Sequence, residues 1–228
     1  MIQIGMRKVQ FAENEYYHLY NRGVDKRIIF STKDDFDRFK AYLYLLNDSD
    51  NARAANFFDS RSRSEIFSVA RSQQLVAIGA YCMMPNHFHI LATPLVENGI
   101  SKFMQKIQTA YAMYFNEKTL RSGRLFQGTF KAKHVAEDVY LKYLYAYIHL
   151  NPAEFLKEDW DDSDGEAFRA HQNKILSYPY SSALEYSSAQ FSIVDPKSFP
   201  KYFLKAKDMQ SHLQFWQQYR KELARNKK

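Results

Sequence analysis

Two histidines separated by one residue are the first feature of the sequence that could do chemistry. His87 and His89 stand in an apolar run, with Phe88 between them and Ile90 after them. On a β-strand alternate side chains point to the same face, so both imidazoles could reach one metal ion while the apolar pair faces a core. The pair is also compatible with a half-buried strand on which each histidine finds a carbonyl partner.

A second pair of polar side chains follows about sixty residues later. Tyr147 and Asn151 lie in a segment with helical apolar spacing, which Pro152 should end. Residues at i and i+4 share a helix face, so a phenol and an amide oxygen could be presented to one site. His149 is two positions from Tyr147 and points elsewhere, which indicates a structural role.

Four segments together resemble a known family. Residues 85–89 (PNHFH) and 147–152 (YIHLNP) resemble the single-tyrosine HUH transposases of small insertion sequences (IS200-like), including the REP-associated tyrosine transposases. Residues 17–23 (YHLYNRG) and 123–128 (GRLFQG) match the same pattern, in the family's order. The resemblance covers roughly Tyr16 to Pro152, and a short later block at 178–186 extends it.

The resemblance implies an enzyme that cleaves and rejoins single-stranded or hairpin DNA. Tyr147 would be the nucleophile and would form a 5′-phosphotyrosine, leaving a free 3′-hydroxyl on the other product. His87, His89 and Asn151 would hold a divalent metal, and an amide oxygen suits Mg or Mn. Neither the general base nor the DNA sequence recognised follows from the residues, and Tyr147 could act in its own subunit or in that of a partner.

Two other function classes compete with the transposase. A non-catalytic DNA- or RNA-binding protein descended from such an enzyme would not need His87, His89, Tyr147 and Asn151 together, which favours the enzyme. A purely structural zinc protein would need a fourth ligand at a usual spacing, and the sequence offers none.

The charge and the aromatic content favour a nucleic-acid partner. The net charge is +7, and the chain has 17 tyrosines and 18 phenylalanines. Basic side chains attract phosphates, and aromatic rings stack on unpaired bases. The expected DNA contacts are Arg22, Arg121, Arg124, Lys131 and Lys133. The alternatives are a merely solvated side chain for Arg22 and an exposed strand edge guarded by lysines for the other four.

The remaining composition bounds the setting of the protein. Cys82 is the single cysteine, which excludes an intrachain disulfide and a cysteine-rich zinc cluster. No apolar run approaches the roughly 20 residues that span a bilayer. We therefore expect a cytoplasmic, nucleoid-associated protein with no membrane contact, either a monomer or a homodimer.

Apolar periodicity predicts the elements that must position the site. The expected order is a strand at 16–22, a helix capped by Ser31 or Thr32, strands at 75–82 and 87–93 joined by a turn, a helix from Asn98 or Ser101, a strand at 125–135 and a helix from Asp138. This order agrees with the fold that the resemblance implies, an α+β, ferredoxin-like antiparallel sheet with helices packed on one face, plus a C-terminal helical extension.

The chain is expected to divide into two parts. Residues 1–152 would form the catalytic domain, with a mobile insertion at 49–74. Residues 153–228 would form the extension packed on it, with an acidic loop at 158–166 that must lie away from bound DNA. The block at 178–186 would serve packing.

Overall fold

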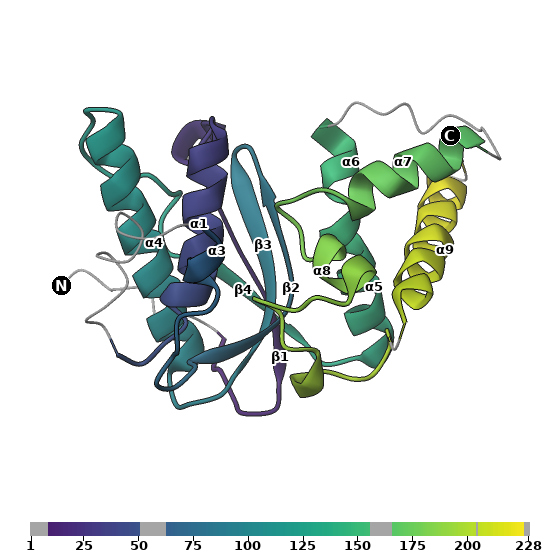
Figure 1. The fold of residues 1–228 in the computed structure, drawn as a ribbon, viewed down its shortest axis with the longest axis horizontal. Coiled ribbons are helices and arrows are strands. Elements are labelled where there is room, and N and C mark those ends of the chain that lie inside the picture. The colour runs from purple at the N-terminus through teal and green to yellow at the C-terminus, as the bar shows by residue number, and fades with distance from the viewer. Residues whose placement is uncertain (1–8, 51–62, 156–165, 204, 226–228) are drawn as a thin grey trace.

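A four-stranded antiparallel sheet forms the centre of the protein (Figure 1). The computed structural model describes residues 9–50, 63–155, 166–203 and 205–225. The strand order is β2-β3-β1-β4, with α1 between β1 and β2 and α4 between β3 and β4. This is the ferredoxin-like arrangement, so the predicted α+β fold is confirmed. The strands are β1 (Tyr16–Arg22), β2 (Val76–Met84), β3 (His87–Pro94) and β4 (Lys131–Val135).

Helices cover both faces of the sheet (Figure 1). The expected layer on one face consists of α1 (Lys33–Leu45) and α4 (Gly99–Lys118), which pack against each other. The opposite face is covered by α5 (Asp138–Leu150), which contacts β2, β3 and β4. The extension continues this second layer with α6 (Pro152–Phe155), α7 (Glu166–Leu176), α8 (Ala183–Ser188), the short η2 (Pro196–Ser198) and α9 (Ala206–Arg225).

The alternation of side chains along β3 divides the polar site from the aromatic core. Phe88 contacts Phe39 of α1 and Phe126, with ring centroids 4.9 and 6.0 Å apart. His89 points to the other face, where its ring lies 5.4 Å from that of Tyr147 on α5. The alternation that the sequence predicted for this strand is therefore present, and it aims the histidines at the helix that carries the tyrosine.

The buried carboxylate of Asp35 fastens α1 to α4. Thr32 caps α1, and its hydroxyl and the Asp35 carboxylate form a reciprocal capping box. The same carboxylate accepts hydrogen bonds from the Tyr114 hydroxyl (2.8 Å) and the Lys118 ammonium (2.6 Å) of α4. A buried charge is stable only when it is paired in this way, so the pair fixes how the two helices lie against each other.

The segment after β1 holds the turn between β2 and β3, from which His87 emerges. The amide of Gly23 donates to the Asn86 carbonyl (2.9 Å), and the amide of Ile29 donates to the Pro85 carbonyl (2.8 Å). A side chain at Gly23 would come within 2.5 Å of the Arg27 carbonyl oxygen, so only glycine fits. The short η1 (Val24–Lys26) follows directly.

A glycine and a proline set the ends of two predicted elements. The expected strand at 125–135 is shorter, because β4 begins at Lys131. Phe126 forms only an isolated bridge with Gly23, and Gly128 adopts a φ of 119°, which interrupts an extended strand. As expected, α5 ends before Pro152, and the proline then begins α6, where its missing N–H costs nothing.

The predicted insertion lies partly, and the predicted acidic loop almost wholly, outside the described residues. Residues 51–62 of the expected insertion and 156–165 around the acidic loop belong to this undescribed part. The described ends of the insertion are held together, because the Asp48 carboxylate accepts hydrogen bonds from the backbone amide (2.9 Å) and hydroxyl (2.5 Å) of Ser72. The short α3 (Arg63–Ile66) lies in the same segment.

The extension is joined to the sheet and to α5 through Ser182. Its hydroxyl lies 2.7 Å from Nε2 of His149 and accepts from the amide of Tyr81 (2.9 Å). The amide of Ser182 donates to the Tyr81 carbonyl (3.0 Å). The block that contains Ser182 thus packs against both layers, as expected.

No helix in the described parts is long and apolar enough to cross a membrane.

Candidate active site

A cavity of about 270 Å³ lies where β1, β3 and the end of α5 meet. Four residues that the sequence singled out border it: His87 and His89 from β3, Tyr147 from α5, and Asn151 just after that helix. The complete lining is Tyr20, Asn21, Arg22, His87, His89, Gln127, Lys131, Tyr147 and Asn151. The cavity is thus bordered by two imidazoles, a phenol, amides and two cationic side chains.

A second histidine pair orients His89. Nδ1 of His89 lies 2.8 Å from Nε2 of His18, which stands on the neighbouring strand β1. Both side chains are buried. Because Nδ1 is occupied by this hydrogen bond, Nε2 is the ring nitrogen of His89 that a ligand would use.

The ring of His87 is held by its neighbour in the turn. Its Nδ1 lies 2.5 Å from the side-chain oxygen of Asn86, and that contact again leaves Nε2 for a ligand. The rings of His87 and His89 are perpendicular, with centroids 5.0 Å apart. The geometry that strand alternation predicted is therefore present, with a hydrogen bond fixing each ring.

The imidazoles of this site are neutral at physiological pH. Burial lowers the pKa of His87 to about 4, and the charge of Arg22 acts in the same direction. Burial also lowers the pKa of His18 to about 4, assisted by Lys133. The pKa of His89 falls well below its ordinary value, because of burial and then of the neighbouring His18, His87 and Arg22. Only a neutral imidazole can donate a lone pair to a metal, so these shifts favour metal binding.

Asn151 is fixed by a bond to its own helix. Its side-chain Nδ2 donates to the backbone carbonyl of Tyr147 at 2.7 Å, one turn earlier. This bond uses the amide nitrogen, so Oδ1 is the atom that a cation would bind. The Asn151 side chain is buried and borders the same cavity as both histidines.

The donor set fits a divalent metal with open positions. Two imidazole nitrogens and one amide oxygen border the cavity, and the preference of Mg and Mn for oxygen ligands suits the amide and an incoming phosphate. No group of three His, Cys, Asp or Glu with metal-binding geometry occurs within the described residues. The candidate site is therefore a two-histidine, one-amide site rather than a closed structural cage.

Tyr147 stands over the histidines. Its ring lies 5.4 Å from that of His89 and 5.9 Å from that of His18, both edge to face. Tyr145, two positions earlier, is 1% exposed and packs instead against the extension. Among the tyrosines of α5, only Tyr147 borders the cavity.

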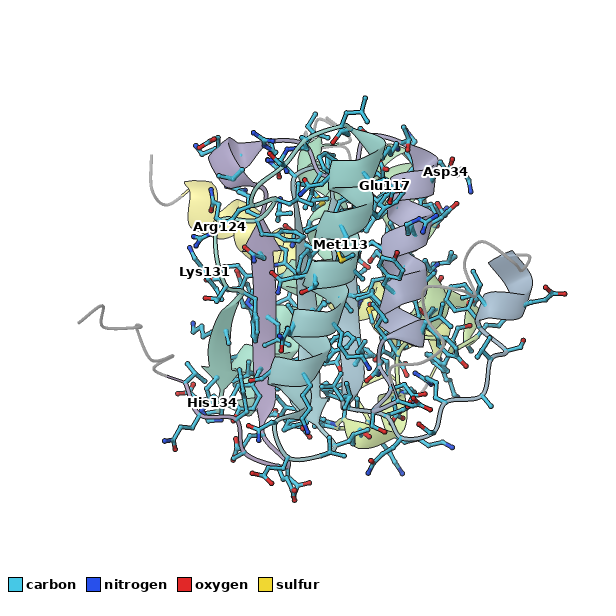
Figure 2. All side chains as sticks on the ribbon, turned by 90° about the vertical axis from the view of Figure 1, so that its left-hand side faces the viewer. Asp34, Met113, Glu117, Arg124, Lys131 and His134 are labelled. Atoms are coloured by element: carbon cyan, nitrogen blue, oxygen red, sulfur yellow. The ribbon has the colours of Figure 1, made fainter. Side chains whose placement is uncertain are left out.

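The predicted DNA contacts divide between two places. Arg22 and Lys131 border the cavity, and Lys133 follows Lys131 along β4. Arg121 instead donates to the Asn116 side chain (2.5 Å) of α4 and to a backbone carbonyl. Arg124 lines a separate hollow of about 810 Å³ beside α4, on the face of the molecule shown in Figure 2. The structure therefore brings two of the five basic residues to the cavity, and Lys133 lies beside Lys131 on β4.

Comparison with known proteins identifies the family of this chain. Residues 16–151 match the family described as "Transposase IS200 like". The chain belongs to this transposase family. None of the curated proteins compared matches it. Among solved structures it is similar to a REP-associated tyrosine transposase bound to a REP hairpin, at 12% identity and a TM-score of 0.47, over 86% of this chain and 96% of that one.

Sequence reasoning missed four residues of the candidate site of this IS200-like transposase. His18 was expected to be a core histidine; it is buried, and it also holds His89. Tyr20, Asn21 and Gln127 border the cavity without having been singled out. The sequence contained a signal for two of them, His18 and Tyr20, because these residues alternate with Arg22 along one strand face. Only the pairing of β1 with β3, which sets Tyr20 opposite His89, reveals that this face meets the histidines.

Proposed function

We propose that this protein is a metal-dependent transposase that cleaves and rejoins single-stranded or hairpin DNA through a 5′-phosphotyrosine intermediate. One observation carries the proposal: the phenol of Tyr147, the imidazoles of His87 and His89 and the amide of Asn151 border a single cavity. Membership of the transposase family supports DNA strand cleavage and transfer as the reaction class.

Tyr147 would act as the nucleophile. Its Oη attacks the phosphorus, the bond between phosphorus and the 3′-oxygen breaks, and that oxygen takes up a proton to leave as a 3′-hydroxyl. The phenolic proton must depart as the new bond forms, since a phenol with a pKa near ~10 is mostly protonated at neutral pH. Attack of a 3′-hydroxyl on the phosphotyrosine reverses the step and joins strands.

Nε2 of His87, Nε2 of His89 and Oδ1 of Asn151 would hold the divalent metal, Mg or Mn. When bound, such an ion polarises a non-bridging oxygen of the scissile phosphate. His18 holds His89 in the required orientation. Because the imidazoles and the amide carry no charge, they do not neutralise the cation, which retains its strength as a Lewis acid.

The cationic side chains of the cavity would bind the substrate phosphates. Arg22 can form paired hydrogen bonds with phosphate oxygens, and Lys131 adds a second positive charge across the cavity. Arg121 and Arg124 would contact DNA farther from the scissile bond. Residues 1–152 would form the catalytic domain and 153–228 the extension, acting as a monomer or a homodimer.

The decisive experiment scores covalent adducts on labelled single-stranded hairpins taken from the DNA that flanks the gene. The parent protein with Mn should form a denaturant-resistant adduct, and Tyr147→Phe should form none while it binds DNA as tightly. Tyr145→Phe, on the same helix but away from the cavity, is the matched control and should keep the adduct. If Tyr147→Phe forms as much adduct as the parent, Tyr147 is not the nucleophile. Hairpin binding without any adduct in the parent would favour the non-catalytic DNA-binding protein.

A further inference from the structure

We propose that the surface between β4 and α5 binds the unpaired strand that flanks the scissile phosphate. This surface, here called the strand seam, consists of Lys131 and Lys133 on β4 and of Tyr140 and Tyr143 on α5. The inference rests on the proposed function, because it extends the path of the DNA away from the cavity.

The helix side of the strand seam is a ladder of tyrosines that leads to the nucleophile. Tyr140, Tyr143 and Tyr147 share one face of α5, and each successive pair of rings has centroids 6.1 Å apart and planes inclined by 32° and 35°. All three rings are partly exposed, in contrast to the buried Tyr145 of the same helix. At 1.5 Å of rise per residue the ladder extends about 10 Å from the site.

The strand side supplies positive charge beside these rings. Lys131 and Lys133 are exposed and point to the same side of β4, the strand at the edge of the sheet. Nζ of Lys133 lies 4.1 Å from the centre of the Tyr140 ring. Figure 2 shows Lys131 at the open margin that β4 forms. The lysines therefore follow the ladder, and Lys131 also borders the cavity.

The nearby carboxylates do not neutralise the strand seam. Glu15 pairs with His134 at 2.5 Å, and Asp138 pairs with Lys142 at 2.7 Å. Within the described residues, neither Lys131 nor Lys133 forms a salt bridge. The seam keeps two uncompensated positive charges, so a polyanion is the partner that it fits.

The chemistry favours a single strand over a duplex. Tyrosine rings offer faces on which unpaired bases can stack, whereas a duplex keeps its bases stacked on one another. Ammonium groups at alternate positions of an edge strand can follow successive phosphates without reading the sequence. The strand seam should thus bind a short run of unpaired nucleotides that enters or leaves the cavity.

Binding of hairpins with and without unpaired flanks tests this proposal. We would measure Kd by anisotropy for a blunt hairpin and for hairpins that carry flanks of about two, four and six nucleotides on the 5′ or the 3′ side. The parent should gain affinity from one flank. The double variant Tyr140→Leu/Tyr143→Leu should lose about tenfold in Kd on that flanked hairpin and nothing on the blunt one. Lys133→Gln should lower the slope of log K against log salt by about 0.7 on the flanked hairpin alone.

Matched controls come from the same helix. Tyr145→Phe removes a hydroxyl from a buried ring, and Lys142→Gln removes a charge that already pairs with Asp138; both should bind every hairpin as the parent does. If the seam variants gain as much from the flank as the parent, or lose affinity equally for blunt and flanked hairpins, the proposal is wrong. A Tyr147-dependent adduct in the parent would then leave the proposed function standing.

Discussion

The two faces of the sheet differ in what they bury. The face under α1 and α4 buries rings against rings, as where Phe88 meets Phe39. The face under α5 buries imidazoles in pairs, as where His89 meets His18. Both sets come from the same strands, since alternate residues of β1 and β3 point to opposite sides. The core and the site therefore share one backbone, and every change to that backbone affects both.

The comparison explains why the polar face can be buried at all. A buried imidazole without a hydrogen-bond partner costs about 1–3 kcal/mol, which neutral partners largely offset. The bond between His18 and His89 meets this need, whereas Ser182 satisfies only Nε2 of His149, whose buried Nδ1 has no partner among the described residues. The rings of the aromatic face need no such pairing, because their stability comes from area and packing. Mutations on the two faces should consequently fail in different ways.

Substitutions at two adjacent residues of β3 should produce the largest difference between the two faces of the sheet. Phe88→Ala removes a fully buried ring and should lower the free energy of unfolding by about 3–5 kcal/mol. His87→Ala, at the rim of the cavity, should leave the free energy of unfolding within about 1 kcal/mol of the parent and abolish the DNA adduct. Urea unfolding and adduct formation on both variants check this. If His87→Ala still forms the adduct, His87 is not part of the site.

Replacing His18 should weaken metal binding without removing a ligand. His18→Phe fills the same space but cannot hold His89, so the affinity for Mn should fall about 10- to 100-fold. His18→Gln can restore a hydrogen bond and should recover part of the loss. Titration of Mn followed by electron paramagnetic resonance gives the affinity independently of DNA cleavage. Equal affinities in all three proteins would reduce His18 to a packing residue.

The smallest expected effect is a difference in pH dependence between the faces. Burial lowers the pKa of His149 to about 3, with a further contribution from His212. Between this value and about 6.5 the unfolded chain binds a proton that the folded chain does not, so stability falls as the pH falls through that range. The loss between pH 6.5 and 5.5 should be about 1 kcal/mol for each such histidine.

The carboxylate of Asp35, on the aromatic face, should affect the free energy of unfolding only at lower pH. Burial would raise the pKa of Asp35, but the bonds from Lys118 and Tyr114 outweigh it and hold the pKa below its ordinary range. Its contribution is fully present above the unfolded value near ~3.9 and is lost below it. Unfolding by urea at several pH values separates the two windows: Asp35→Asn should flatten only the lower one and His149→Gln only the upper one.

The sequence predicted those features that depend on local spacing. The alternation of His87 and His89 on β3 and the shared face of Tyr147 and Asn151 on α5 follow from the strand and helix repeats, and the structure has both. The partner of His89 did not follow, because the contact with His18 depends on strand pairing across seventy-one residues. Likewise Arg124 matched a family motif, yet it lies beside α4, where the Asn116 side chain donates to the Gly123 carbonyl and the Arg121 side chain to that of Arg124.

The hydrogen bonds of the Ser182 hydroxyl limit where the chain can be truncated without loss of structure. The family match ends at residue 151, yet Ser182 supplies the side-chain partner of His149 and pairs with Tyr81 at the centre of β2. An expression fragment that stops at the family boundary would leave His149 unpaired and uncover α5, the helix that presents Tyr147. Fusions and truncations should therefore keep the chain through α8. If the extension is exchanged for that of a relative, the residues that contact Ser182 should be transferred together with it.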